Sequence, residues 1–261
     1  MSRMATPSSR VAVPGLDECL ALDPTRPLYV THVRGPLTLT VVSIAWLRGI
    51  GDRARTNLES RHLTDVESAQ ARQLPLSKRR LEWLAGRLAL KHGVCAYQRR
   101  HFGTRAGTRE VHVSAVTDGL RAGKPHVDFP VEVGLSHSVD FAVAACGPRT
   151  VGIDIERVRR MPPLLTELLT TTPRTAKAES LGVRAMPPSL RWTCKEAVLK
   201  HFGFGLRVDP QEVELTDWRP DGRFSWRAGP GLRLHVPDSD GTRFDSWARE
   251  VDGYSVALVW R

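Results

Sequence analysis

Residues 151–156 read VGIDIE, a short apolar run with two acidic residues at alternate positions. Side chains alternate along a strand, so a strand here places its β-branched residues on one face and Asp154 and Glu156 on the other, roughly 6.5–7 Å apart. Two carboxylates on one face repel each other unless a cation lies between them, and oxygen ligands at this spacing suit Mg²⁺. A solvated acidic face on an edge strand is the alternative interpretation.

A helix is predicted downstream of this strand, over Ser189–Phe202. Its packed stripe comprises Leu190, Cys194, Ala197, Val198 and His201. Glu196 and Lys200 stand four residues apart on a neighbouring flank. By itself such a pair is a common surface ion pair, which contributes only about 0.2–0.5 kcal/mol.

The residues GLSHS at 134–138 are predicted to form a turn between the apolar runs Val131–Val133 and Phe141–Cys146. A lone histidine in a turn is usually structural or solvated. Here hydroxyl residues flank His137, and Lys124-Pro125 lies a short distance upstream. Donors suited to phosphate could therefore converge at this point.

A long helix is predicted over Ser77–His92, where apolar residues recur at helical spacing and Gly93 follows as the expected terminator. Arg80, Arg87 and Lys91 fall on one flank of it, seven and four residues apart. One helix face could thus present three cations to a single phosphate-bearing ligand. A solvated cationic face is the alternative.

The predicted elements form two successive α+β units of similar length, with a boundary near Gly147–Arg149. We predict a partly disordered N-terminal extension over residues 1–36 with one strand near Leu28–Val33, then α+β subdomains over 37–148 and 149–261. Further elements are expected as a strand at Leu37–Leu47, a helix at Asp65–Gln73, β-rich runs at Glu110–Val116 and Val131–Cys146, a strand at Thr150–Arg157, an irregular stretch with helical pieces at Pro163–Leu181, and strands at Glu212–Leu215, Arg223–Trp226, Gly231–Val236 and Tyr254–Trp260.

The composition is that of a globular protein. The 261 residues include 38 Lys+Arg and 28 Asp+Glu, for a formal net charge of +10, and 41% are hydrophobic. The longest apolar run falls short of the roughly 18–20 residues of a membrane span, and the first residues lack the apolar run of a secretory signal. We therefore expect a cytoplasmic chain without a transmembrane helix. The four scattered cysteines are expected to be reduced thiols in packing positions.

The basic surplus is concentrated in residues 61–110, which hold eleven Lys+Arg and four Asp+Glu. Of the 38 cations, 32 are Arg, whose planar fork suits phosphate oxygens. An Arg-rich coding bias would give the same count without any ligand. Charge alone is therefore only weak support for an anionic partner such as phosphate, a nucleotide or nucleic acid.

Five motifs taken together resemble the 4′-phosphopantetheinyl transferase superfamily, specifically the monomeric surfactin-synthetase-activating (Sfp) type. They occur in order between residues 63 and 205, as Arg80-x-Glu82-Trp83-x-x-Gly86-Arg87, Gly123-Lys124-Pro125, Leu135-Ser136-His137-Ser138, Val151-Gly152-Ile153-Asp154-Ile155-Glu156 and Trp192-x-x-Lys195-Glu196-x-x-x-Lys200. Each is weak alone, but five in one order at compatible spacing are specific. The resemblance implies a monomer built as a pseudo-dimer of two similar α+β subdomains, with coenzyme A and Mg²⁺ in the cleft between them.

The same resemblance implies an enzyme, a 4′-phosphopantetheinyl transferase or holo-[acyl-carrier-protein] synthase. Such an enzyme transfers the phosphopantetheine arm of coenzyme A to a serine of an apo acyl or peptidyl carrier protein of fatty-acid, polyketide or nonribosomal-peptide biosynthesis, and it releases adenosine 3′,5′-bisphosphate. Asp154 and Glu196, helped by Glu156, would ligate Mg²⁺. Lys200 would face the diphosphate, and Glu196 is the candidate acceptor of the serine proton. The residues matched to coenzyme A binding are Arg80, Arg87, Lys124, Pro125, Ser136, His137 and Lys200.

One departure from the family pattern lies in the short helix before Ser77. Glu67 and Gln70 stand where family members often carry basic residues that contact the 3′-phosphate of the nucleotide. Arg72, Lys78 or Arg79 are the candidate substitutes.

Two other functions are weighed against the transferase. A nucleic-acid-binding protein could lay the basic segment 61–110 along a phosphate backbone, with affinity that falls steeply with salt. That reading leaves Asp154, Glu156 and Glu196 unexplained. An inactive coenzyme A binder of the same fold is disfavoured, because all three carboxylates and Lys200 are present.

Overall fold

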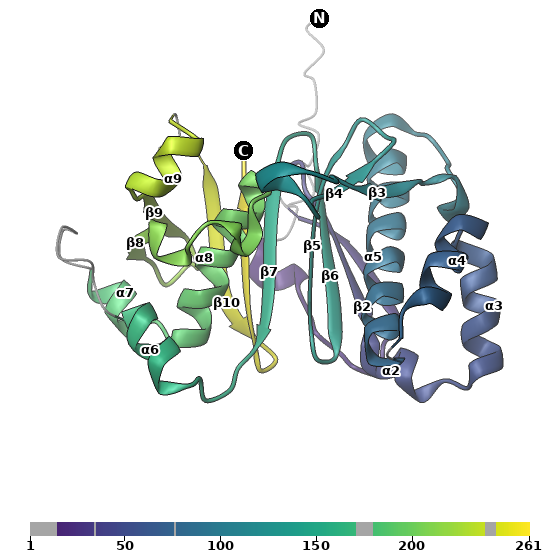
Figure 1. Ribbon diagram of the computed structural model, residues 1–261, viewed down its shortest axis with the longest axis horizontal. Helices are drawn as coiled ribbons and strands as arrows, with labels where there is room; N and C mark the ends of the chain where they lie inside the picture. The colour runs from purple at the N-terminus through teal and green to yellow at the C-terminus, as the bar shows by residue number, and fades with distance from the viewer. Residues whose placement is uncertain (1–14, 34, 76, 171–179, 238–243) are drawn as a thin grey trace, which may run out of the picture.

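The computed structural model describes residues 15–33, 35–75, 77–170, 180–237 and 244–261 (Figure 1). Within these residues the chain is an α+β protein with antiparallel sheets and two long helices. Figure 1 shows α5 (Ser77–Phe102) to the right of the two larger sheets and α8 (Pro188–Phe202) toward their left. The fold thus brings sequence-distant motifs toward the middle of the molecule.

The four-stranded sheet has the order β1-β2-β6-β5 and is antiparallel throughout. Its strands are β1 (Leu28–His32), β2 (Thr38–Ser43), β6 (Phe141–Gly147) and β5 (Glu132–Ser138). Helix α5 packs its apolar side chains on one face of this sheet. β2 and β6 are buried along their whole length, as expected for central strands covered on both faces.

The three-stranded sheet has the order β10-β11-β7, with β10 at Asp245–Val251, β11 at Tyr254–Trp260 and β7 at Val151–Arg157. Helix α8 packs on one face of it. Ile153 and Ile155 point the other way, into a core shared with Val41 and Val143 of the four-stranded sheet. The alternation predicted for residues 151–156 is confirmed, and it leaves Asp154 on the opposite face from Ile153 and Ile155.

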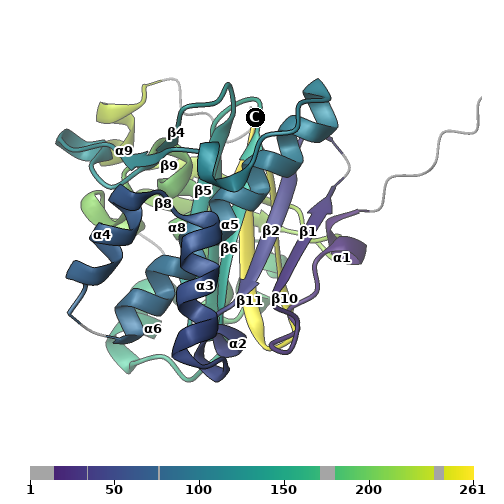
Figure 2. The same ribbon diagram turned by 90° about the vertical axis from the view of Figure 1, so that its right-hand side faces the viewer.

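The other α-helices and strands that the structure describes flank the two larger sheets and the helices packed on them. They are α1 (Leu16–Cys19), α2 (Ile44–Gly49), α3 (Asp52–His62), α4 (Asp65–Gln73), β3 (Val113–Ala115) paired with β4 (Pro125–Val127), α6 (Pro163–Thr170), α7 (Leu181–Ala185), β8 (Val213–Trp218) paired with β9 (Phe224–Ala228), and α9 (Pro230–His235). Figure 2 shows α3 and α4 covering the outer flank of α5.

Several predicted elements are confirmed, among them the helix at Asp65–Gln73, the strand that becomes β7, and the helix that becomes α8. The predicted end of the long helix at Gly93 is wrong, because α5 continues to Phe102. Gly93 faces the sheet, where a Cβ would lie 2.9 Å from Thr40 Oγ1 and 3.0 Å from Cys146 Sγ. This glycine allows close helix–sheet packing rather than ending the helix.

Three further predictions need correction. The strand expected to run to Leu47 ends at Ser43, whose hydroxyl accepts from the Trp46 N–H and starts α2. The GLSHS residues lie within β5, and the turn follows at Val139, which has a φ of 49°. The strand expected at Gly231–Val236 is helix α9, with Pro230 in its first turn, a position that proline favours.

The N-terminal extension predicted over residues 1–36 is ordered in part. β1 forms an edge of the four-stranded sheet, and it confirms the strand predicted near Leu28–Val33. Cys19, Leu20 and Leu22 are buried in the core shared by the two sheets, so this segment belongs to the packed body. Residues 1–14 and residue 34 of the predicted extension lie outside the described residues.

Two expectations from composition concern the whole chain. Among the residues that the structure describes, no helix is both long and apolar enough to cross a membrane. All four cysteines are buried, as expected for packing positions.

Candidate active site

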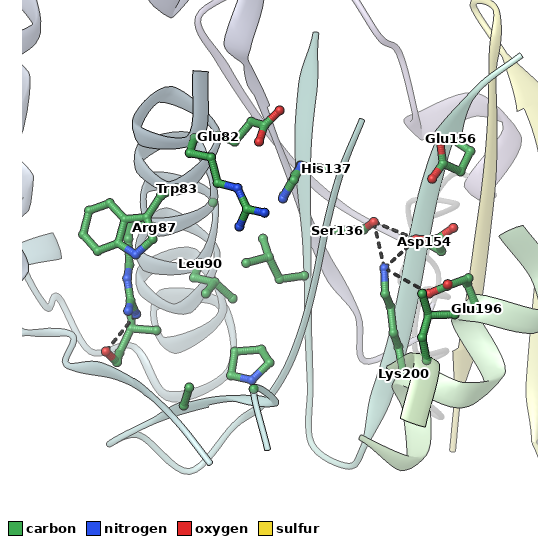
Figure 3. Close-up of a pocket in the computed structure, with 18 of the residues that line it drawn as sticks. Glu82, Trp83, Arg87, Leu90, Ser136, His137, Asp154, Glu156, Glu196 and Lys200 are labelled. Atoms are coloured by element: carbon green, nitrogen blue, oxygen red, sulfur yellow. Dashed lines mark hydrogen bonds and ion pairs between the residues drawn. The ribbon is translucent and has the colours of Figure 1, made fainter. Parts of the chain in front are cut away.

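A pocket of about 860 Å³ is lined on one side by α5 and on the other by β7 and α8, with β5 between them (Figure 3). It brings together most of the residues singled out in the sequence. Those on its lining are Arg87, Pro125, Ser136, His137, Asp154, Glu156, Glu196 and Lys200.

The contact between β7 and α8 depends on Gly152. A Cβ at this position would overlap the carbonyl oxygen of Ala197 and lie 2.5 Å from the backbone nitrogen of His201. Because Gly152 has no side chain, the helix backbone rests directly on the strand. Glu196 and Lys200, one helical turn apart, are thereby held beside Asp154.

Lys200 is the cation at the centre of the acidic cluster. Its Nζ lies 2.6 Å from Asp154 Oδ1 and 3.7 Å from Glu196 Oε2, and it donates to Ser136 Oγ at 3.0 Å (Figure 3). The pair Glu196–Lys200, which looked like an ordinary surface pair in the sequence, is therefore part of a three-sided charge cluster. The two acidic motifs, 42 positions apart in the printed sequence, do meet.

The two serines of β5 bind the two carboxylates of β7. Ser136 Oγ donates to Asp154 Oδ1 at 2.7 Å, and Ser138 Oγ donates to Glu156 Oε2 at 3.1 Å. Asp154 and Glu156 thus point to the same side, as their spacing predicted.

The electrostatics of the cluster follow from burial and crowding of like charges. Burial raises the pKa of Glu196 to about 7, and Asp154 and Glu156 add to this rise while Lys200 opposes it. Burial, followed by the charge of Asp154, also raises the pKa of Glu156. Burial lowers the pKa of Lys200, but the neighbouring carboxylates outweigh it and the pKa is raised overall. The single positive charge of Lys200 therefore does not balance the negative charge of the three carboxylates.

The donor set fits a hard divalent cation such as Mg²⁺. All three acidic side chains offer oxygen, which Mg²⁺ prefers. Asp154 Oδ2 is buried and has no hydrogen-bond partner, so one ligand oxygen is left for a cation. Within the described ranges, no group of three or more His, Cys, Asp or Glu side chains already stands in a metal-holding arrangement. The oxygen donors of the expected site are thus chemically suited to such a cation.

The flank of three cations predicted on α5 is not presented to one ligand. Arg80 pairs with Glu59 at 3.0 Å, and the fully buried Lys91 pairs with Glu67 at 2.6 Å. These acids come from α3 and α4; α3 was missed in the sequence, and it covers this flank together with α4. Arg87 alone of the three lines the pocket, where it donates to the Val113 carbonyl and lies over the Trp83 ring.

The structure also places the residues of two other expectations from the sequence. Lys124, matched to coenzyme A binding, pairs with Glu132 at 2.8 Å and is absent from the pocket lining, whereas Pro125 is on it. Glu67, the departure from the family pattern, is a buried structural partner of Lys91. Of the three substitutes considered for the 3′-phosphate, Lys78 and Arg79 line the pocket.

Sequence reasoning gave no role to several lining residues. Glu82, Trp83 and Trp192 stand in the sequence only as parts of motifs, and no sequence pattern distinguishes Ser114 and Leu206. The signal that could have indicated Glu82 is its place one turn after Lys78 on the same helix.

Comparison with known proteins connects this site to a family. Residues 150–259, which carry Asp154, Glu156, Glu196 and Lys200, match the family model of the 4′-phosphopantetheinyl transferase superfamily. A 4′-phosphopantetheinyl transferase, Gsp, of Aneurinibacillus migulanus is 32% identical over 88 residues, which are 33% of this chain and 37% of that protein. The match thus spans little more than a third of that relative's length.

A solved structure of a holo-(acyl-carrier-protein) synthase from Bacillus anthracis, in complex with CoA (3′,5′-ADP), is 23% identical and covers 42% of this chain and 92% of its own, with a TM-score of 0.34. The motif resemblance inferred from the sequence is confirmed by the family match and the curated relative. Residues 150–259 are therefore similar to the 4′-phosphopantetheinyl transferase superfamily.

Proposed function

We propose that this protein is a Mg²⁺-dependent 4′-phosphopantetheinyl transferase that modifies a serine of an apo acyl or peptidyl carrier protein. The observation that carries the proposal is the meeting of Asp154, Glu196 and Lys200 on one pocket wall, within the segment that matches the superfamily. Glu156 joins them on the same lining.

Coenzyme A would occupy the pocket between α5 and the β7–α8 unit. Its diphosphate would lie near Lys200, and the nucleotide end would extend along β5 and α5 past His137 and Arg87. Lys78 and Arg79, at the start of α5, are the cations placed to receive a 3′-phosphate. Lys124 and Arg80 are not given a direct contact, because each is engaged by an acidic side chain away from the lining.

The pocket side chains divide the reaction between them. The carrier serine oxygen attacks the phosphorus nearest the pantetheine arm, and the phosphorus–oxygen bond to adenosine 3′,5′-bisphosphate breaks. Glu196, a carboxylate on the pocket lining, accepts the serine proton. Lys200 stabilises the negative charge that grows on the leaving diphosphate oxygen.

Asp154 and Glu196, with help from Glu156, would hold Mg²⁺. When bound, Mg²⁺ neutralises phosphate oxygens and so lowers the barrier to attack by a nucleophile. The unpartnered Asp154 Oδ2 is the oxygen most directly available to it.

The proposal includes the architecture expected from the resemblance. The N-terminal and C-terminal subdomains, 37–148 and 149–261, would be the halves of a pseudo-dimer, with the active site in the cleft between them. In support, each half packs one long helix on an antiparallel sheet, and the pocket takes its lining from both. The expected state is a cytoplasmic monomer.

The test is transfer itself. The protein is incubated with coenzyme A, MgCl₂ and each of several apo carrier proteins of fatty-acid, polyketide and nonribosomal-peptide type, and intact carrier masses are measured. The carrier mass is expected to increase by one phosphopantetheine arm. No increase is expected when EDTA is present during the incubation. Coenzyme A binding measured in parallel identifies an inactive binder, because binding without transfer to any carrier would overturn the enzyme proposal.

A further inference from the structure

The facing edges of the two larger sheets, β5 and β7, meet through an unusual junction. β5 is the edge of the four-stranded sheet and β7 is the edge of the three-stranded sheet. At one end the contact is backbone to backbone, because a Cβ on Gly134 would lie 2.8 Å from the Val151 carbonyl oxygen. Further along, at Ser136 and Ser138, serine hydroxyls fill the junction instead.

Each serine repeats the same pair of hydrogen bonds. Ser136 Oγ accepts the Ile155 N–H at 3.4 Å while donating to Asp154 Oδ1, and Ser138 Oγ accepts the Arg157 N–H at 3.1 Å while donating to Glu156 Oε2. The hydroxyl therefore replaces the backbone acceptor that a continuous sheet would supply, and it satisfies an edge N–H of β7. The same serine oxygen also binds the carboxylate of the residue that precedes this N–H in β7, Asp154 or Glu156.

This geometry explains the residue types at alternate positions of β5. Residues 134, 136 and 138 face β7. Residue 134 is glycine where the two backbones touch, and residues 136 and 138 are serine where hydroxyls bridge the strands. Ser136 and Ser138 are 5% and 8% exposed, so their hydroxyls bond inside the junction rather than to solvent. A one-donor, two-acceptor hydroxyl suits this position, because it can receive an N–H and bind a carboxylate at once.

We propose that Ser136 and Ser138 are positioning residues that join β5 to β7 and thereby hold Asp154 and Glu156 in the orientation needed to bind the metal. This rests on the proposed function, and it assigns a role to Ser138. It also gives Ser136 a task beyond contact with the nucleotide. Second partners of metal-binding carboxylates typically change metal affinity about 10- to 100-fold when removed.

Ser138 gives the cleaner test, because Ser136 also contacts Lys200. The full-length chain is titrated with Mn²⁺ by calorimetry, without coenzyme A, as wild type, Ser138→Ala, Ser138→Thr and Ser246→Ala. Thr keeps the hydroxyl and suits a strand. Ser246 is the matched control, a buried strand serine whose hydroxyl donates to the Phe224 carbonyl rather than to a carboxylate. Ser138→Ala should weaken Mn²⁺ binding about 10-fold or more, Ser138→Thr should restore most of it, and Ser246→Ala should leave it unchanged.

A second measurement needs no metal. Hydrogen exchange at the Arg157 amide should be faster in Ser138→Ala than in wild type and slow again in Ser138→Thr, since the hydroxyl is the acceptor of that N–H. Unchanged Mn²⁺ affinity in Ser138→Ala, or a Thr variant no better than Ala, would overturn the positioning role. If wild type itself binds no Mn²⁺, the metal in the proposed function fails, and the exchange data alone decide whether the junction exists as described.

Discussion

Two lysine–carboxylate pairs in this molecule have nearly identical local geometry and different roles. Lys91 on α5 lies 2.6 Å from Glu67, and Lys200 on α8 lies 2.6 Å from Asp154. In each pair the second carboxylate oxygen is buried without a hydrogen-bond partner. The lysine side chain is 0% exposed in the first pair and 27% exposed in the second.

What surrounds each pair explains the difference. Lys91 is sealed between α4 and α5, and it also donates to the Thr108 carbonyl. Lys200 lines the pocket and lies close to a second carboxylate, that of Glu196. A sealed pair can only hold the fold together, whereas a pair with access to a pocket and surplus negative charge can bind and exchange a ligand cation. Short contact distance alone does not identify a site.

The largest effect is expected from breaking the sealed pair. Glu67→Ala leaves the Lys91 ammonium buried without its counter-ion, which should lower the free energy of unfolding by about 3–5 kcal/mol in urea titrations. Asp65→Ala is the matched control on the same helix, where the pair with Arg109 is exposed, and it should change stability very little. Equal losses in the two variants would remove the distinction between a sealed and an exposed pair.

Breaking the pocket pair should affect turnover more than folding. Asp154→Ala is expected to lower the transfer rate about 10²- to 10³-fold or more, because it removes a proposed ligand of the Mg²⁺ that would neutralise the reacting phosphates. Lys200 keeps Glu196 and access to the pocket, so the loss of unfolding free energy should be smaller than for Glu67→Ala. The transfer rate is measured as the carrier mass gain over time, and the free energy of unfolding is measured by urea titration of the same preparation. Near-normal transfer would exclude Asp154 from the mechanism.

Lys200→Ala should separate binding from turnover. Loss of one charged contact to the leaving group is expected to slow transfer about 10- to 100-fold. Coenzyme A affinity, measured by calorimetry, should fall only modestly, because other lining cations such as Arg87 remain. Unchanged turnover would leave Lys200 with the passive role that Lys91 has.

The pocket cluster should lose stability as pH rises. Glu196 has a folded pKa of about 7 against an ordinary 4.5, so the folded state retains a proton that the unfolded state releases. In EDTA its contribution to the unfolding free energy therefore falls between about pH 4.5 and pH 7. Glu196→Gln should flatten this part of the profile. A profile identical to that of wild type would contradict the assignment.

The sealed region should behave in the opposite way. Burial lowers the pKa of His92, the neighbour of Lys91 in sequence, to about 4 from an ordinary 6.5, and the charge of His62 adds to this. The unfolded state then binds the proton first, so stability falls as pH drops from about 6.5 to 4. His92→Gln should reduce this acid sensitivity in urea unfolding at pH 5 compared with pH 7. Undiminished acid sensitivity would exclude His92 as its source.

Much of the site was predictable from local periodicity. The alternation of residues 151–156 placed Asp154 and Glu156 on one face, and the helical repeat placed Glu196 and Lys200 on one flank. Both rest on backbone geometry that depends on near neighbours only. The helix at Asp65–Gln73 was equally legible, because Thr64 and Glu67 form a capping box at its start.

The errors came from positions whose role depends on distant contacts. Gly93 resembles a helix terminator until β2 and β6 are seen packed against it. Lys91 and Arg80 resemble ligand-binding cations until α3 and α4 supply their acidic partners. Propensity and spacing contain no information about which element covers which flank.

The amino-acid sequence by itself determined the order of the motifs and the pairs of side chains that share a face, since such sharing follows from the repeat of a strand or a helix. Only the tertiary structure decided that Gly152 lets α8 rest on β7, that Lys200 rather than Lys91 faces the pocket, and that the β5 serines bind the β7 carboxylates. These depend on contacts between residues at least 18 positions apart in the sequence. Such contacts form only when whole sheets and helices pack, because burial and charge pairing are properties of the assembled fold.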